Sequence, residues 1–486
     1  IVFGDWSSDV CSSDLFRVPQ RLPRRLPFRM PLGLSLGMPL SLPFGLRIRR
    51  RALTLRADIS WIPGFWDSVK DYVFVREEDE VVILPPNMVY KTNRTGLKVL
   101  EWIGRGRSVA DIPGMDAGRM GDVVAFLKDI KELCEGRSVP TQTVPYGFDF
   151  TRLPILGEIA VTYACNNRCQ FCDAGCSPEG AAEGCSPEGD MSLGEIKRVI
   201  DLFRDEAKIP FFSLTGGEPL LREDLEEIIA YGESRKLRVN LITNGTLASP
   251  GRARSLYAAG LRTAQVSLES PEAGIHDELC GAPGAWERTI RGIKALQGAG
   301  IEVQTNTTVT RKNRESLGSL AAFLKGLGIR RFSMNLYIPS ANLEMAPELL
   351  VPYSEIGDFV DKAKASAQRE GMVFYWYSPT PLCIYNPMAR GLGNKSCAAA
   401  DGLISVNPRG EVLPCSSYNL PLGNLLRQPF REVWFSSRAS AFKQKRQAPE
   451  SCRTCGSFVA CQAACPLYWK DRKSTRLTSS HRIRSR

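Results

Sequence analysis

The residues best able to do chemistry in this chain of 486 residues are cysteines, and four of them lie in one short stretch, residues 164–176. Cys165, Cys169 and Cys172 follow the spacing C-x3-C-x2-C. A structural zinc ion or a fully ligated [4Fe–4S] cluster takes four protein ligands. Three thiolates on one tight loop therefore favour a [4Fe–4S] cluster with one iron left open. A zinc site or a redox pair is the alternative for these three residues taken alone.

Cys176 is the fourth cysteine of this stretch, and it belongs to a repeat. The sequence GCSPEG occurs at residues 175–180 and again at residues 184–189, so that Cys176 and Cys185 are copies of one another. A duplicated loop rich in Gly and Pro is a poor source of an obligatory ligand. We predict that neither cysteine binds the metal.

A second group of cysteines lies further along the chain. Cys397 and Cys415 are followed by a C-x2-C-x5-C-x3-C pattern made of Cys452, Cys455, Cys461 and Cys465. In a chain without a secretion signal, such spacings indicate metal ligation rather than disulfides. A zinc ribbon is the alternative for the last four. His276 is the only histidine between residues 57 and 470, which argues against His-ligated zinc and Ser-His-Asp catalysis.

The elements that must position these cysteines alternate between strand and helix. Strand patterns lie at Ile155–Ala164, Phe211–Thr215, Val239–Thr243, Ala264–Leu268, Glu302–Val309 and Arg331–Ile338. Helical patterns separate them; in Ser192–Phe203, Ser192 and Glu195 form a capping box. Six such units predict an α/β fold with a parallel sheet, either barrel-like or doubly wound. Both forms bind ligands at the C-terminal ends of the strands, where the three-cysteine loop begins.

Polar motifs end the next strands as well. Thr215-Gly-Gly-Glu-Pro219 follows the second strand, Leu241-Ile-Thr-Asn-Gly245 the third and Val266-Ser-Leu-Glu269 the fourth. Glycines let a ligand approach the backbone closely, and a glutamate can accept a hydrogen bond from an ammonium group. Each motif alone could be an ordinary turn, but together they predict one binding site at this edge of the sheet.

The loop spacing, the aromatic Phe171 before the third cysteine and the glycine-rich motif resemble the radical S-adenosylmethionine (SAM) superfamily. The resemblance implies a partial (β/α)6 barrel at residues 150–345. It implies that the open iron chelates SAM, and that an electron from the cluster cleaves the sulfonium to a 5′-deoxyadenosyl radical. A reductant such as flavodoxin or ferredoxin is then an expected partner. The implied SAM contacts are Gly216, Gly217, Glu218, Pro219, Asn244, Ser267, Glu269 and Asn306.

The later cysteines, together with the G-x4-C run that ends at Cys415, resemble the SPASM extension, placed here at residues 370–470. This resemblance implies one or two auxiliary iron–sulfur clusters. One would be held by Cys452, Cys455, Cys461 and a cysteine lost after Cys465. The other would be held by Cys397, Cys415 and Cys465, with Cys383 as a candidate fourth ligand. Ser416 stands where sulfatase maturases of this family carry a catalytic Asp, which argues against that activity.

Residues 58–145 precede the barrel and predict a small winged-helix-like module. Strand patterns at 71–92 are followed by helical patterns at Gly96–Ile103 and Arg119–Cys134. The strands and Tyr90…Asn93-Arg-Thr-Gly96 resemble the leader-peptide recognition elements of peptide-maturation systems such as pyrroloquinoline quinone biosynthesis. A generic packing domain is the alternative. Residues 58–137 hold eleven basic and fourteen acidic side chains, so no nucleic-acid partner is expected.

The two ends of the chain read as translated sequencing adapter. One codon choice for DWSSDVCSSDL, residues 5–15, has a reverse complement that translates to DRKSTRLNSS, and residues 471–480 read DRKSTRLTSS. We therefore expect residues 1–57 to be an adapter-derived, non-native leader and residues 471–486 an adapter-derived tail. The net charge of +11 comes from these ends, because residues 57–470 carry a net charge of −1. No stretch is apolar enough for a membrane helix, and a cytoplasmic protein is expected.

Three functions follow from these features. The first is a radical SAM/SPASM oxidoreductase that abstracts hydrogen from a ribosomally made precursor peptide to form a crosslink or an oxidised residue. The second is a related enzyme on a small molecule, such as the haem-pathway radical SAM decarboxylases. The third is a non-catalytic iron–sulfur electron carrier. No general base can be ranked among the Tyr, Lys and carboxylate residues at the strand ends.

Overall fold

A computed structural model of the chain describes residues 58–84, 88–135, 150–176, 189–339, 346–393 and 396–470. The predictions for Cys185 and for both adapter-like ends lie outside these residues. The described chain falls into two compact units. One comprises residues 70–97 and 150–470, and the other residues 58–69 and 98–135. No helix in these ranges is long and apolar enough to cross a membrane.

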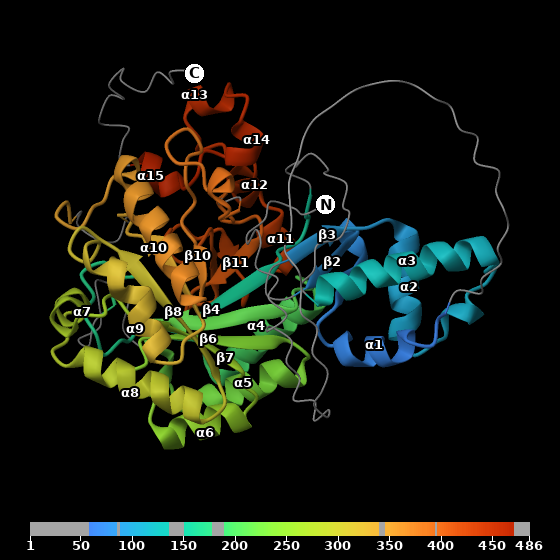
Figure 1. Cartoon of the computed structure of the whole chain (residues 1–486), viewed down its shortest axis with the longest axis horizontal. Helices are drawn as coiled ribbons and strands as arrows, with labels where there is room; N and C mark the ends of the chain where they lie inside the picture. Colours follow the sequence, from blue (N-terminus) through green and yellow to red (C-terminus); the bar gives the residue numbers. More distant parts are fainter. Residues whose placement is uncertain are drawn as a thin grey trace, which may run out of the picture. The chain divides into compact units, whose positions relative to one another are not determined.

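A ten-stranded sheet forms the centre of the larger unit (Figure 1), in the order β10-β9-β8-β7-β6-β5-β4-β11-β12-β13. In this order, each strand from β10 to β11 is parallel to the next. Strand β12 is antiparallel to both of its neighbours, β11 and β13. The parallel strands are β4 Leu156–Thr162, β5 Phe211–Gly216, β6 Arg238–Thr243, β7 Thr263–Ser267, β8 Glu302–Val309, β9 Arg331–Leu336, β10 Val373–Trp376 and β11 Leu403–Val406; β12 is Glu411–Leu413 and β13 is Gly423–Asn424. The expected α/β fold with a parallel sheet is confirmed, and the six predicted strands are β4 to β9 in chain order.

Helices follow the parallel strands and pack on the sheet. They are α4 Leu193–Asp205, α5 Leu225–Ser234, α6 Pro250–Ala258, α7 Ala273–Cys280, α8 Ala285–Gly298, α9 Leu320–Gly326 and α10 Ile356–Glu370. The capping box of Ser192 and Glu195 starts α4 as predicted. Helix α4 buries Ile196, Val199, Ile200 and Phe203, each contributing about 2 kcal/mol by removal from water. Gly157 of β4 lets Phe203 approach, because a Cβ there would lie 2.5 Å from its ring.

Strand β11 pairs with β4 in parallel, with Ser405 opposite Glu158. The cysteine-rich segment is therefore joined to the barrel through one continuous sheet. Five short helices follow: α11 Phe430–Trp434, α12 Ser437–Lys443, α13 Glu450–Arg453, α14 Phe458–Cys461 and α15 Pro466–Lys470. Local hydrophobic patterns did not predict the pairing of β11, because they do not specify which distant strand a segment will contact.

The strands expected at residues 71–92 form a three-stranded antiparallel sheet of β1 Phe74–Arg76, β2 Val81–Leu84 and β3 Met88–Lys91. This sheet belongs to the same unit as the barrel. Helix α2, Arg94–Gly104, begins at the end of that stretch. In the smaller unit, α1 Ile62–Val69 contacts α3 Ala117–Cys134. The predicted strands and helices are present, and their role as a recognition module stays a prediction.

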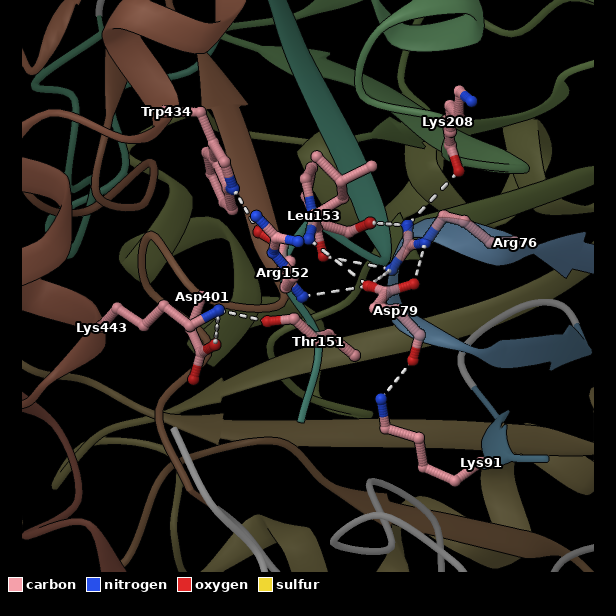
Figure 2. A network of polar contacts seen from close by, with 11 residues as sticks. Arg76, Asp79, Lys91, Thr151, Arg152, Leu153, Lys208, Asp401, Trp434 and Lys443 are labelled. Carbon is pink, nitrogen blue, oxygen red and sulfur yellow. Dashed lines mark hydrogen bonds and ion pairs between the residues drawn. The ribbon is translucent and has the colours of Figure 1, made fainter. Parts of the chain in front are cut away.

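A buried ion pair links the three-stranded sheet to the segment that enters β4 (Figure 2). Arg76 donates from Nε and Nη2 to the two carboxylate oxygens of Asp79 at 2.8 and 2.7 Å, and neither side chain is exposed. The same guanidinium donates to the carbonyl oxygens of Leu153 and Pro154. On the other flank, Trp434 Nε1 donates to the carbonyl oxygen of Arg152 at 3.0 Å. Residues 151–154 are thus held from both sides.

Candidate iron–sulfur and SAM site

The three-cysteine loop follows β4 directly and is held against the end of α7. Arg168 N donates to Cys280 O and Gln170 N donates to Leu279 O, both at 2.9 Å. Gly281 has φ +59°, and a Cβ there would lie 2.4 Å from Arg168 O, so only glycine fits this contact. The loop therefore stands at the C-terminal edge of the parallel sheet, as predicted.

The three thiols of the loop lie in one partly buried environment. Burial raises the pKa of Cys165 to about 12, and the nearby Cys169 and Cys172 add to this rise. The pKa of Cys169 is raised by its hydrogen bond to Cys280, by burial and by Cys172. Thiolates that are buried together repel one another, so an iron cluster that neutralises their charge fits this donor set.

Cys172 differs from the other two, because Cys176 lies against it. The Cys176 backbone N–H donates to Cys172 Sγ at 3.3 Å. The Cys176 thiol and this N–H lower the pKa of Cys172 to about 7, which favours the thiolate that iron binds. Cys176 thus contacts a predicted ligand, Cys172, a contact that its duplicated sequence did not indicate. The prediction that it is not itself a ligand stays a prediction.

The fit of a polar ligand is supported by a buried amide in the same loop. Asn167 is 1% exposed, and both polar atoms of its side chain lack a hydrogen-bond partner among the described residues. Such a group costs about 1–3 kcal/mol when left unpaired.

In the described ranges no three Cys, His, Asp or Glu side chains converge on a point for one metal ion. In a cluster each thiolate binds its own iron, so convergence on one point is not required.

Gly216, the last residue of β5, and Gly217 let the end of this strand approach the backbone that leads from β4 into the cysteine loop. Gly216 has φ +128°, and a Cβ there would lie 2.1 Å from Thr162 O. A Cβ on Gly217 would lie 2.1 Å from Ala164 O, directly before the first cysteine. Pro219 follows as the first residue of a short 3-10 turn, Pro219–Leu221. The glycine-rich motif therefore packs backbone to backbone against the start of the cysteine loop.

Glu218 is fully buried and accepts three hydrogen bonds. Thr243 Oγ1 and Leu220 N donate to Oε1 at 2.7 and 2.9 Å, and Asn244 N donates to Oε2 at 2.7 Å. Burial raises the pKa of this carboxyl. The side chain thus joins the ends of β5 and β6. Its expected role as an acceptor for an ammonium group stays a prediction.

Asn244 brings the end of β6 to the cluster loop. Its Nδ2 donates to Asn166 Oδ1 at 2.9 Å and lies 4.0 Å from Cys165 Sγ. Asn166 Nδ2 in turn donates to Thr246 Oγ1 at 2.8 Å. The sequence prediction included Asn244 but missed Asn166, whose place between the first two cysteines was the available signal.

Ser267 ends β7, Glu269 follows two residues later, and Asn306 lies within β8. Ser267 is the register partner of Asn306. Asn306 donates from Nδ2 to Asn335 Oδ1 at 2.7 Å. Glu269 is 1% exposed and accepts from Thr308 N at 2.7 Å. These predicted residues share the same edge of the sheet, and their contact with SAM stays a prediction.

The later cysteines form two groups. Burial raises the pKa of Cys415, and Cys397, Cys465 and Glu158 add to the rise. Burial also raises the pKa of Cys452, and there the acting thiols are Cys461, Cys383 and Cys455. Cys383 thus acts on Cys452, whereas the sequence expectation made it a candidate ligand of the Cys397 group; its role as a ligand stays a prediction.

Gly217→Ala is expected to weaken SAM binding about tenfold or more. The new Cβ would meet a backbone oxygen, so the cysteine loop must shift, at a cost of about 1–3 kcal/mol in stability. Titration calorimetry with SAM measures the affinity. Gly194→Ala is the matched control, because a Cβ there meets nothing within 4 Å and should leave the affinity unchanged. An unaltered affinity in Gly217→Ala would contradict the inference that the close packing of Gly217 against Ala164 shapes the SAM site.

Glu269 predicts a pH dependence of stability. Burial raises its pKa from 4.5 to about 7. The folded protein then holds this proton more tightly than the unfolded chain, so its contribution to stability is present below pH 4.5 and is lost as the pH rises through 7. The neutral variant Glu269→Gln should therefore gain on the parent by on the order of 3 kcal/mol across that range. Urea unfolding of the SAM-free protein measures the gain. The exposed Glu272→Gln is the control, and a pH-independent difference for Glu269→Gln would refute the assignment.

Comparison with known proteins agrees with this geometry. Residues 159–336 match the Radical SAM superfamily, and residues 397–456 match the SPASM iron-sulfur cluster-binding domain. The AdoMet-dependent heme synthase of Nitratidesulfovibrio vulgaris is 31% identical over 320 residues, which cover 61% of this chain and 82% of that protein. The PqqA peptide cyclase of Methylocella silvestris is 30% identical over 251 residues, covering 50% of this chain and 65% of that protein.

Among solved structures, Streptococcus suis SuiB bound to its precursor peptide SuiA is similar, with a TM-score of 0.62. The match covers 83% of this chain and 96% of SuiB at 16% identity, so it shows a shared fold. The cofactors of the radical SAM domain are a [4Fe–4S] cluster and SAM. Those of the SPASM domain are auxiliary iron–sulfur clusters. The chain therefore belongs to the radical SAM superfamily, as an enzyme that carries a SPASM domain after its radical SAM domain.

Proposed function

We propose that this enzyme acts on a ribosomally made precursor peptide and forms a crosslink or an oxidised residue in it. When bound, the cluster and SAM supply the radical that abstracts hydrogen. The main support comes from the small sheet β1-β2-β3. Among the described strands, the outer edges of β1 and β3 pair with no other strand. The hydrogen bonds of Arg76 to Leu153 and Pro154 hold this sheet beside the segment that enters β4. An open strand edge binds an extended peptide by adding a strand. The PqqA peptide cyclase, and the similar fold of SuiB bound to its precursor peptide, support the same class of substrate.

A second candidate is a haem precursor, favoured by the 31% identity to the heme synthase. The test uses the whole chain, because residues 70–97 belong with the barrel and an excised 58–137 fragment would divide that unit. Reconstituted enzyme, SAM and reductant are incubated with the peptide encoded beside the gene or with a haem precursor. Mass spectrometry should show hydrogen loss from the peptide. Conversion of the haem precursor with an unchanged peptide would replace the first candidate by the second. A protein that forms no 5′-deoxyadenosine would contradict both.

A further inference from the structure

Cys383 lies outside both matched domains, because the radical SAM match ends at residue 336 and the SPASM match begins at residue 397. It stands in the connection between β10 and β11, and it is exposed. An exposed cysteine in a connecting segment would ordinarily have no assigned role. Its neighbours give it one.

The backbone beside Cys383 is bonded to a cysteine far along the chain. Leu382 N donates to Cys461 Sγ at 3.4 Å. This N–H···S contact places residue 383 next to the last member of the C-x2-C-x5-C pattern. A turn closes the pattern itself, because Cys455 N donates to Cys452 O at 3.1 Å. The described backbone therefore brings Cys383 beside the segment of Cys452, Cys455 and Cys461, about seventy residues further along the chain.

The backbone between Cys461 and Cys465 passes through a left-handed segment. Gln462, Ala463 and Ala464 have φ values of 53°, 58° and 58°. Three successive non-glycine residues in this region cost about 1–2 kcal/mol each and are not a default path. Cys461 precedes this left-handed segment and Cys465 follows it, so the chain changes direction between the two cysteines.

We propose that Cys383 is the fourth thiolate ligand of an iron–sulfur cluster held by Cys452, Cys455 and Cys461. Four thiolates complete the ligation of a [4Fe–4S] or [2Fe–2S] cluster. The cluster then has no open iron for a substrate, and its chemistry is electron transfer. Cys383 and Cys455 are both exposed, so this cluster lies where a reductant can approach it. The ligand set is complete within residues 383–461 and differs from the sequence expectation, in which Cys383 served the other cluster.

Double variants test the grouping, since two ligands of one cluster should not act additively. The starting protein carries Cys165→Ala, Cys169→Ala and Cys172→Ala, so that only auxiliary iron is counted. Iron, sulfide and the electron paramagnetic resonance spectrum of the reduced protein are measured. Cys383→Ala with Cys452→Ala should lose no more iron than Cys452→Ala alone. Cys383→Ala with Cys397→Ala should lose iron from both clusters. The reverse pattern, or unchanged iron and spectrum in Cys383→Ala, would overturn the proposal.

Alkylation provides a test without any substitution. The exposed Cys383 and Cys455 should both react with iodoacetamide in the iron-free protein. After reconstitution both should be protected, and peptide mass spectrometry should show at least a tenfold fall in labelling. Cys455 is the matched control, because it is exposed like Cys383 and belongs to the C-x2-C-x5-C pattern. If Cys455 is protected while Cys383 still reacts, Cys383 is not a ligand. Neither test depends on the identity of the substrate.

Discussion

Cys169→Ala is expected to abolish the formation of 5′-deoxyadenosine from SAM, a fall of at least about a hundredfold. Cys169 is one of the three predicted ligands, so its removal leaves two of them for a cluster that needs three. Chromatography of the reduced, reconstituted protein with SAM measures the product. Iron analysis should show the loss of one cluster, while the auxiliary iron remains.

Cys176→Ala is the matched control for this result. It lies in the same loop, and its backbone N–H, which contacts Cys172 Sγ, survives the substitution. The variant should therefore keep its iron and most of its 5′-deoxyadenosine formation. Loss of a full cluster in Cys176→Ala would mean that the loop carries four ligands. Substantial SAM cleavage by Cys169→Ala would contradict the assignment of the catalytic cluster.

Arg76→Met is expected to lower the free energy of unfolding by about 3–5 kcal/mol, because it leaves the Asp79 carboxylate buried without its cation. It also removes the contacts that hold Leu153 and Pro154 in front of β4. Urea unfolding followed by circular dichroism measures this change. The double variant Arg76→Met with Asp79→Leu should recover much of the loss, since no unpaired charge then remains.

The matched control is Arg94→Met. Arg94 pairs with Glu80 at 2.8 Å, but its side chain is 84% exposed. Solvent screens such a pair, and its removal should cost less than about 1 kcal/mol. Equal losses in the two variants would show that the buried network contributes nothing beyond an ordinary surface ion pair. Arg76→Met should also reduce SAM cleavage. Arg76 holds the residues that lead into β4, and the cysteine loop begins where β4 ends.

Much of the fold and of the radical SAM site could be predicted from local patterns. Alternating strand and helix signals located β4 to β9, because hydrophobic periodicity reflects which face each element buries. The C-x3-C-x2-C loop and the Gly216-Gly217 motif could be assigned to one edge, because parallel strands end together. The spacing of Cys165, Cys169 and Cys172 favoured an open cluster, and the polar motifs at the ends of the next strands were needed to weaken the zinc and redox-pair alternatives.

The sequence by itself thus indicated the candidate donor atoms, the succession of strands along the chain and the edge of the sheet at which the motifs meet. The tertiary structure decided which distant segments share a site. It joined β11 to β4, placed Asn166 against Asn244 and brought Leu382, the neighbour of Cys383, against Cys461. The physical reason is that spacing constrains neighbours within a loop. The contact between Leu382 and Cys461 depends instead on the packing of the whole unit and on the left-handed turn after Cys461, which no local pattern encodes.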